Sequence, residues 1–338
     1  MTNTVTLGSP GDVQFPENAG EKKRRLPRKL WQTAGPLVIF VAMFGLVAAL
    51  TPTFLGGGGL SVVAISAAPI LLVALGQALV LNVGSIDLSN ASLTLLAAIL
   101  LAMTLAPLAS AAPLVVVLLV TLFGAVNGLL VAFTQVPSFA LTLGTFGIFQ
   151  ASALVVSNAT TVYVSENGGP IIGLFENRIA GIPLTFWLGV IVAVILWWML
   201  RFTRLGQGMT AIGVNETGAI FSGMHTRWLK VAAFALSGLL AGLAGITIIA
   251  QAGSASPTGL GSDLLLPGIA AAIVGGTSIS GGVTNPINVI FGALTVALIP
   301  IATAVIGIDA QAQNLVYGVV IIAVVALTMA HSRSDVVK

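Results

Sequence analysis

Long apolar runs dominate the chain, and short polar stretches separate them. A helix that crosses the hydrocarbon core of a membrane needs about 20 mostly apolar residues. Applied along the chain, that length predicts about ten spanning helices and therefore an all-α, multi-pass membrane protein. The predicted spans are 32–54, 60–83, 88–108, 112–134, 137–157, 183–203, 231–251, 264–281, 286–307 and 313–331.

Polar segments flank the predicted membrane domain, which covers residues 31–331. Residues 1–30 are polar and end in a basic cluster at 21–29, which we interpret as a flexible cytosolic tail that helps to set the orientation of the first span. Residues 332–338 are interpreted as a short cytosolic C-terminal tail.

Lys and Arg residues are distributed unevenly between the predicted loops. Six lie in the N-terminal tail, four lie in or beside the 204–230 loop, and two lie in the C-terminal tail. Arg178, in the 158–182 loop, is the one basic residue that falls on the other side. Because cytoplasmic loops carry an excess of Lys and Arg, this distribution predicts that both ends of the chain are cytoplasmic.

Composition excludes several classes of function. The chain is 57% hydrophobic and 7% charged, whereas a soluble domain is about a quarter charged, so neither a soluble domain nor a nucleic-acid-binding one is expected. With no cysteine and two histidines, we expect no disulfide and no thiolate or histidine metal site. The sequence has no phosphate-binding G-x-x-x-x-G-K-[ST] loop and no recognisable catalytic cluster. We therefore expect neither an enzyme nor a cofactor bound by this chain.

Two Gly/Ser/Asp stretches, at 84–89 and 261–265, each precede an apolar run. Interrupted segments at corresponding places in two halves of a chain indicate the substrate path of a transporter. In the predicted topology the first run leads outward and the second leads inward, as in an inverted repeat. Chance similarity between two short polar stretches is the alternative.

Four stretches together resemble the permeases of ribose-type ABC sugar importers, and their order and spacing agree along residues 35–330. They are GSIDLSNAS at 84–92, VPSFALTLGT at 136–145, GQGMTAIGVNE at 206–216 with FSGM at 221–224, and AAAIVGGTSISGG at 270–282. Ser85 and Ala91 stand where the family has glycines.

This resemblance implies a permease subunit of the bacterial inner membrane, with a fold similar to that of the vitamin-B12-type importer permeases. It would import a monosaccharide by alternating access. The implied partners are a second permease subunit, identical or different, a cytosolic ABC ATPase that binds ATP and Mg²⁺, and an extracytoplasmic sugar-binding protein. Related permeases for nucleosides, branched-chain amino acids or a sugar-like signal molecule remain alternatives, as does a secondary carrier that needs no ATPase.

Polar and aromatic residues inside the apolar runs are candidates for the solute pathway. An acid within a membrane segment suggests function, so Asp87 binds solute or gates the path, caps a helix that begins at Leu88, or does both. The uncharged candidates can line a path or join helices by hydrogen bonds, and we favour the second role. For the aromatic candidates we favour packing over sugar stacking. The other candidates are Gln77, Asn82, Ser89, Asn90, Asn127, Phe139, Phe146 and Gln150.

The 204–230 loop contains a candidate for the contact with an ATPase. Residues 215–224 can form a short helix, which Asn215 would cap and whose positive dipole end Glu216 would suit. Its apolar residues would face a groove on the partner, and an ordinary connecting loop is the alternative. The candidate coupling residues are Asn215, Glu216, Ile220, Phe221, Gly223 and Met224.

Overall fold

The protein is mostly helical in the computed structural model, which describes residues 19–56, 58–134, 136–258, 262–309 and 312–332. The first helices are α1 (Ala19–Leu50), α2 (Thr53–Gly56), α3 (Gly59–Asn82), α4 (Asn90–Leu108), α5 (Ala112–Thr134), α6 (Ser138–Val156), α7 (Gly169–Glu176) and α8 (Leu184–Phe202). They are followed by α9 (Arg204–Val214), α10 (Glu216–Phe221), α11 (Thr226–Ala252), α12 (Leu265–Val274), α13 (Pro286–Val305) and α14 (Gln313–Ser332).

Two short 3-10 helices and four two-residue strands complete the secondary structure of the described residues. The 3-10 helices are η1 (Ala109–Ala111) and η2 (Ser262–Leu264). The strands form two antiparallel pairs, β1 (Val162–Tyr163) with β4 (Ser254–Ala255) and β2 (Arg178–Ile179) with β3 (Ile182–Pro183).

Within the described residues, six helical segments are long and apolar enough to cross a membrane, which supports a multi-pass membrane protein. One of them, Asn90–Thr134, consists of α4 and α5, separated by η1. Three shorter apolar helices, Ala34–Leu50, Leu265–Val274 and Gln313–Ile322, lie within α1, α12 and α14.

Each of the ten predicted spans contains a helix, but some boundaries differ from the prediction. Helix α1 begins at Ala19, inside the predicted tail, and α4 begins at Asn90 instead of Leu88. Helix α12 ends at Val274, and its 10 residues extend about 15 Å. That is half the roughly 30 Å of a hydrocarbon core, so the predicted span 264–281 is instead a half-length helix followed by the irregular segment 275–285.

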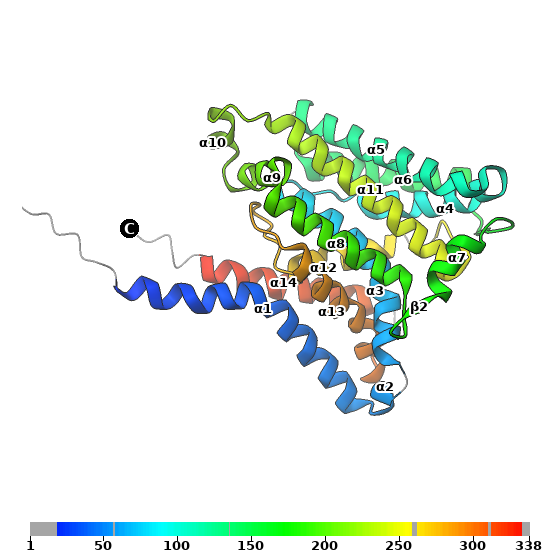
Figure 1. The fold of residues 1–338 in the computed structure, drawn as a ribbon, viewed down its shortest axis with the longest axis horizontal. Helices are drawn as coiled ribbons and strands as arrows, with labels where there is room; N and C mark the ends of the chain where they lie inside the picture. Colours follow the sequence, from blue (N-terminus) through cyan, green and yellow to red (C-terminus); the bar gives the residue numbers. More distant parts are fainter. Residues whose placement is uncertain (1–18, 57, 135, 259–261, 310–311, 333–338) are drawn as a thin grey trace, which may run out of the picture.

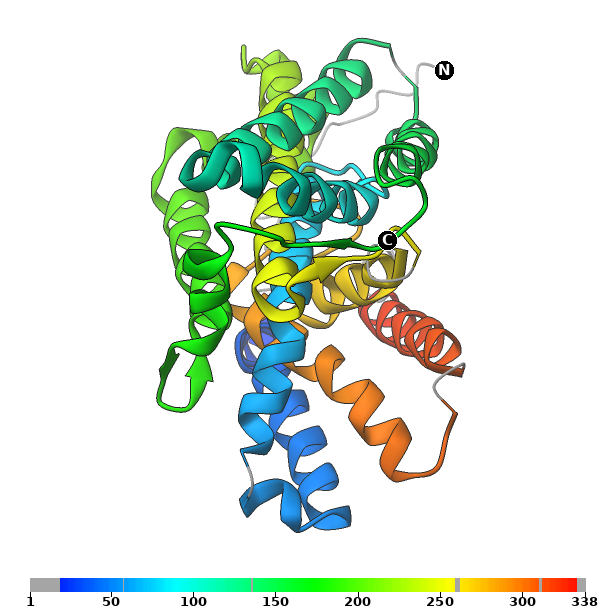
Figure 2. The same cartoon turned by 90° about the vertical axis from the view of Figure 1, so that its right-hand side faces the viewer.

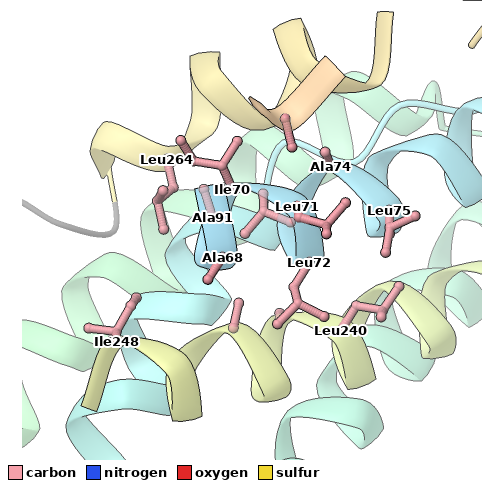
Figure 3. Packing of buried hydrophobic residues seen from close by; sticks show 14 of the residues in the cluster. Ala68, Ile70, Leu71, Leu72, Ala74, Leu75, Ala91, Leu240, Ile248 and Leu264 are labelled. Carbon is pink, nitrogen blue, oxygen red and sulfur yellow. The ribbon is translucent and has the colours of Figure 1, made fainter. Parts of the chain in front are cut away.

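Helices α3 and α11 lie in the middle of the molecule, with the other helices around them (Figure 2). Nearly every residue of α3 from Val63 to Asn82 is buried, because α11, α12, α13 and α8 all pack against it. Figure 3 shows part of this core, where Leu71, Leu72 and Leu75 of α3 lie close to Leu240 of α11.

Glycines bring α5 and α11 into close contact. A Cβ atom at Gly124 would lie 2.5 Å from the carbonyl oxygen of Phe234, and one at Gly238 would lie 2.5 Å from that of Val120. Real Cβ atoms do not approach so closely, so the two helices can touch only where a side chain is absent. Gly242 and Gly245 of α11 make similarly close contacts, with Val117 of α5 and Ala97 of α4.

The two ends of the molecule differ (Figure 1). Helices α9 and α10 lie at one end, together with the start of α1 and the end of α14, whereas α7 and the β2–β3 turn lie at the other. Helices α8 and α11 run between these ends. Residues 1–18 of the predicted N-terminal tail, residues 333–338 of the predicted C-terminal tail and the glycine at 261 lie outside the described residues.

Candidate functional site

A buried polar cluster lies where α3 gives way to α4. Between these helices residues 83–89 are not helical, and Asp87 lies in this interruption with 2% of its surface exposed. Its carboxylate binds Ser89 in the interruption and Ser237 of α11. These two serines are in turn bound by Asn127 of α5 and Asn90 of α4. We name this group the Asp87 cluster, and its members are Gln77, Asp87, Ser89, Asn90, Asn127 and Ser237.

Neutral groups hold both oxygens of the Asp87 carboxylate. Oδ1 accepts from the backbone N–H of Ser89 at 3.0 Å and from its hydroxyl at 2.6 Å. Oδ2 accepts from the hydroxyl of Ser237 at 2.9 Å, across the gap to α11. Buried carboxylates are stable only when hydrogen-bonded or paired. These donors satisfy that requirement among the described residues.

Two asparagines orient the serine hydroxyls that bind Asp87. Asn127 Nδ2 on α5 donates to Ser89 Oγ at 2.8 Å, and Asn90 Nδ2 on α4 donates to Ser237 Oγ at 2.6 Å. Each hydroxyl therefore accepts from an amide and donates to the carboxylate. The Gln77 side-chain amide also donates, to the backbone carbonyl of Asp87. Such networks polarise their bonds mutually and are costly to leave half-satisfied.

Asp87 is not a helix cap in the predicted sense. Helix α4 begins at Asn90, and the side chain of its N-cap residue, Ser89, makes no capping hydrogen bond. Asp87 instead binds the N–H of the N-cap residue from outside the helix. The carboxylate therefore joins the start of α4 to α11.

Helix α6 supports the same interruption from the other side. The hydroxyl of Ser138 accepts from the backbone N–H of Ile86 at 3.0 Å, and that of Thr142 accepts from the N–H of Leu88 at 3.1 Å. These hydroxyls satisfy backbone donors that a continuous helix would have used. Ser138, Thr142 and Ser237 were not among the candidates predicted from the sequence. For Ser138 and Thr142, the spacing of two hydroxyl residues four apart in an apolar helix was a usable signal.

The remaining pathway candidates lie elsewhere. Asn82 is buried, but its side-chain amide donates to the hydroxyl of Thr210 on α9, at 3.1 Å. Phe139 on α6 is 54% exposed, and Phe146 and Gln150 are partly buried. Among the described residues, these three take no part in the hydrogen bonds of the Asp87 cluster.

The segment predicted to contact an ATPase forms α10, which is shorter than predicted. Asn215 caps it, and its side-chain oxygen accepts from the N–H of Gly218 at 2.9 Å. Glu216 at the first position pairs with Lys230 of α11 at 2.6 Å. These contacts fix α10 to the start of α11.

Apolar side chains of α10 face outward. Phe221 is 87% exposed and Ile220 is 54% exposed. Gly223 ends the segment with φ +77°, and Met224 returns to the protein, where its backbone N–H donates to the carbonyl of Ala219. The segment 204–214, expected to be part of a loop, is a helix, α9, and packs between α8 and α10.

Known proteins similar to this chain are transport permeases. Residues 59–325 match the family described as the branched-chain amino acid transport system permease component. The D-allose transport system permease protein AlsC of Escherichia coli K12 is 33% identical over 93% of this chain and 97% of its own length. The ribose import permease protein RbsC of the same strain is 32% identical over 88% and 94%. The autoinducer 2 import system permease protein LsrC of E. coli K12 / DH10B is 31% identical over 85% and 84%. No solved structure gives a significant match.

Proposed function

The chain belongs to the family of branched-chain amino acid transport system permease components, and from that premise we propose that it is the membrane-spanning permease of a bacterial ABC importer for a monosaccharide. The observation that supports this most directly is the nearly full-length similarity to permeases for D-allose and ribose. Partial matches would support only a shared helical core, whereas these include the interruptions and the α9–α10 segment.

The proposed topology has ten membrane segments in the inner membrane, with both chain ends and α9–α10 in the cytoplasm. The distribution of Lys and Arg supports this orientation. The structure supports it as well, because the start of α1 and the end of α14 lie at the same end of the molecule as α10 (Figure 1). In this topology α12 spans half of the membrane and the irregular segment 275–285 completes the crossing, and the two halves of the chain form an inverted repeat like that of the vitamin-B12-type permeases.

In the proposed mechanism, the energy comes from a separate ABC ATPase that binds α10. An aromatic side chain that is 87% exposed at the tip of a capped helix is suited to a groove on a partner. ATP and Mg²⁺ would bind the ATPase, a sugar-binding protein would deliver the solute at the α7 end, and a second permease subunit would complete the pathway. Nucleotide-driven movement of α10 would then switch the path between its outward and inward states.

Two roles are proposed for the pathway candidates. The Asp87 cluster holds α4, α5 and α11 together beside the α3–α4 interruption, and its rearrangement would open or close the path. Phe139, Phe146 and Gln150 on α6 have exposed surface, so they are available to line a path completed by the second subunit.

A sugar-like signal molecule is the second candidate solute. The similarity to an autoinducer 2 permease is almost as high as that to the sugar permeases.

Affinity purification and uptake test the proposal. The tagged chain is purified from its own membranes, and uptake of labelled D-ribose, D-allose and autoinducer 2 is compared in cells with and without the gene. We expect an ATP-hydrolysing subunit to co-purify and the uptake of one sugar to depend on the gene. Uptake by the purified chain alone in vesicles without ATP would instead establish a secondary carrier.

A further inference from the structure

Two separate helix interruptions lie against the end of α9. A Cβ atom at Gly213 would lie 1.9 Å from the backbone oxygen of Asn82, which ends α3, and 2.3 Å from the backbone nitrogen of Gly282, in the segment after α12. That nitrogen donates to the Asn82 carbonyl at 3.0 Å. A Cβ atom at Gly281 would likewise lie 2.8 Å from the carbonyl oxygen of Gly213. We name these four residues, Asn82, Gly213, Gly281 and Gly282, the glycine junction.

The contacts in the glycine junction are between backbones. Gly281 and Gly282 have φ +89° and +73°, a left-handed conformation that other residues rarely adopt. The Asn82 side chain is fully buried and adds a bond to Thr210, one turn before Gly213. Because no flexible side chain separates these backbones, a shift of α9 must displace both interruptions.

The glycine junction is connected at one side to α10. Asn215 follows α9 and caps α10, so Gly213 is three residues from the first residue of the helix that exposes Phe221. A displacement of α10 would therefore move Gly213 as well, because only Val214 and the capping residue Asn215 lie between them.

At its other side the glycine junction connects to both interrupted helix pairs. Asn82 is followed within five residues by Asp87, in the segment between α3 and α4. Gly281 and Gly282 belong to the segment between α12 and α13. Interrupted helices lack some backbone hydrogen bonds, and transporters have their binding sites at such places.

We propose that Gly213 is a positioning residue, through which movement of α10 is passed simultaneously to the α3–α4 and α12–α13 interruptions. This inference rests on the proposed function, since it assigns the internal route by which an ATPase at α10 would open the path. It also gives Asn82 a role in transmission, in line with the helix-joining hydrogen bond favoured for its polar side chain.

The test uses the complete complex of permease, ATPase and binding protein in vesicles. The solute is whichever of D-ribose, D-allose and autoinducer 2 the wild type accumulates. The measured quantity is the uptake ratio, the amount of solute taken up per ATP hydrolysed. The Gly213→Ala complex is expected to keep its ATPase subunit and its basal ATP hydrolysis, but its uptake per ATP should fall at least tenfold. The matched control is Gly45→Ala on α1, where an added Cβ meets no atom within 4 Å. It should behave as the wild type.

A milder variant keeps the proposal testable if Gly213→Ala does not assemble. Thr210→Val removes the hydroxyl that binds Asn82 and leaves the volume almost unchanged, and it should lower uptake per ATP two- to fivefold with full assembly. Wild-type uptake per ATP in Gly213→Ala would overturn the proposal. If that variant does not assemble, an unchanged ratio in Thr210→Val would overturn it. A wild-type chain that purifies without an ATPase would refute the proposed function itself, a result distinct from a defect confined to the variants.

Discussion

Asp87 is a buried acid whose described partners are all neutral. Its two oxygens accept three hydrogen bonds, and the hydroxyls that supply two of them are themselves oriented by Asn127 and Asn90. Hydrogen bonds to a charged acceptor are roughly twice as strong as neutral ones. The charge therefore contributes to the attachment of α4 to α11, independently of any contact with solute.

Replacing Asp87 separates this attachment from a role in transport. Asp87→Ala leaves buried donors without an acceptor, at about 1–3 kcal/mol for each group left unpaired, so stability and uptake should both fall. Asp87→Asn keeps one acceptor oxygen and should cost less stability while still reducing uptake. Melting of the purified protein in detergent and uptake in vesicles measure the two effects. If both variants transport like the wild type at equal expression, Asp87 has no role in transport.

Ser237 provides a test of the same contact from the α11 side. Ser237→Ala removes the donor to Asp87 Oδ2 and one of the two acceptors of Asn90 Nδ2, which keeps the Ser237 carbonyl at 3.0 Å. We expect a loss of about 1–3 kcal/mol, because buried polar groups lose their partners. Ser152→Ala is the control, since that hydroxyl lies on α6 and bonds only its own helix at Ile148 among the described contacts. Equal melting temperatures for the two variants would contradict the assignment.

At the level of elements, α10 is the surface whose role can be tested most directly. Phe221→Ala should leave folding unchanged, because an exposed side chain contributes little to stability, but should reduce co-purification of the ATPase at least tenfold. Tyr163→Ala is matched to it as an aromatic residue, 72% exposed on β1 toward the α7 end. Retention of the ATPase by Phe221→Ala, or its loss with Tyr163→Ala, would argue against α10 as the contact.

The close contact of α5 with α11 predicts a sharp dependence on side-chain size. Gly238→Ala places a Cβ atom 2.5 Å from the Val120 carbonyl oxygen, and such overpacking typically costs about 1–3 kcal/mol. Gly147→Ala on α6 meets no atom within 4 Å and should be neutral or stabilising, because alanine favours a helix over glycine. Thermal unfolding in detergent compares them, and a stable Gly238→Ala would show that the two helices can separate at little cost.

At the level of the whole molecule, the proposed orientation can be tested with thiol reagents because the chain has no cysteine. Ser165→Cys, in the segment before α7, should react with a membrane-impermeant maleimide added to whole cells. Gln207→Cys, exposed on α9, should react only in inside-out vesicles. The reverse pattern would invert the topology.

Hydrophobic runs predicted where the helices lie, because about 20 apolar residues in a row have few other stable arrangements in a membrane. They did not predict that α12 stops at Val274, since the apolar and small residues after it continue the pattern while the Gly275–Gly276 pair ends the helix. The sequence predicts a loop at 204–230 and not α9, because glycines within the segment are unfavourable in helices. At Gly206 and Gly213 the neighbouring backbone lies so close that an added Cβ atom would clash with it.

The candidate site was predictable in part. Polar residues inside apolar runs, such as Asp87 and Asn127, stood out, and the structure joins them through Ser89. Ser237 did not stand out, because a serine among alanines and glycines is equally typical of a helix face that packs closely against another helix. The partnership of Asp87 with Ser237 depends on how distant segments pack, which the local pattern does not specify.

The distance along the chain between Asp87 and Ser237 has a consequence for biogenesis. The two are separated by 150 positions, so a ribosome that adds roughly 5–20 residues per second makes the hydroxyl about 8–30 s after the acid. During that interval the early helices have been synthesised, but the side chain that satisfies Oδ2 does not yet exist. Assembly of the core is therefore a late event that awaits α11, and a message truncated after α8 would yield a chain in which the acid never acquires this partner.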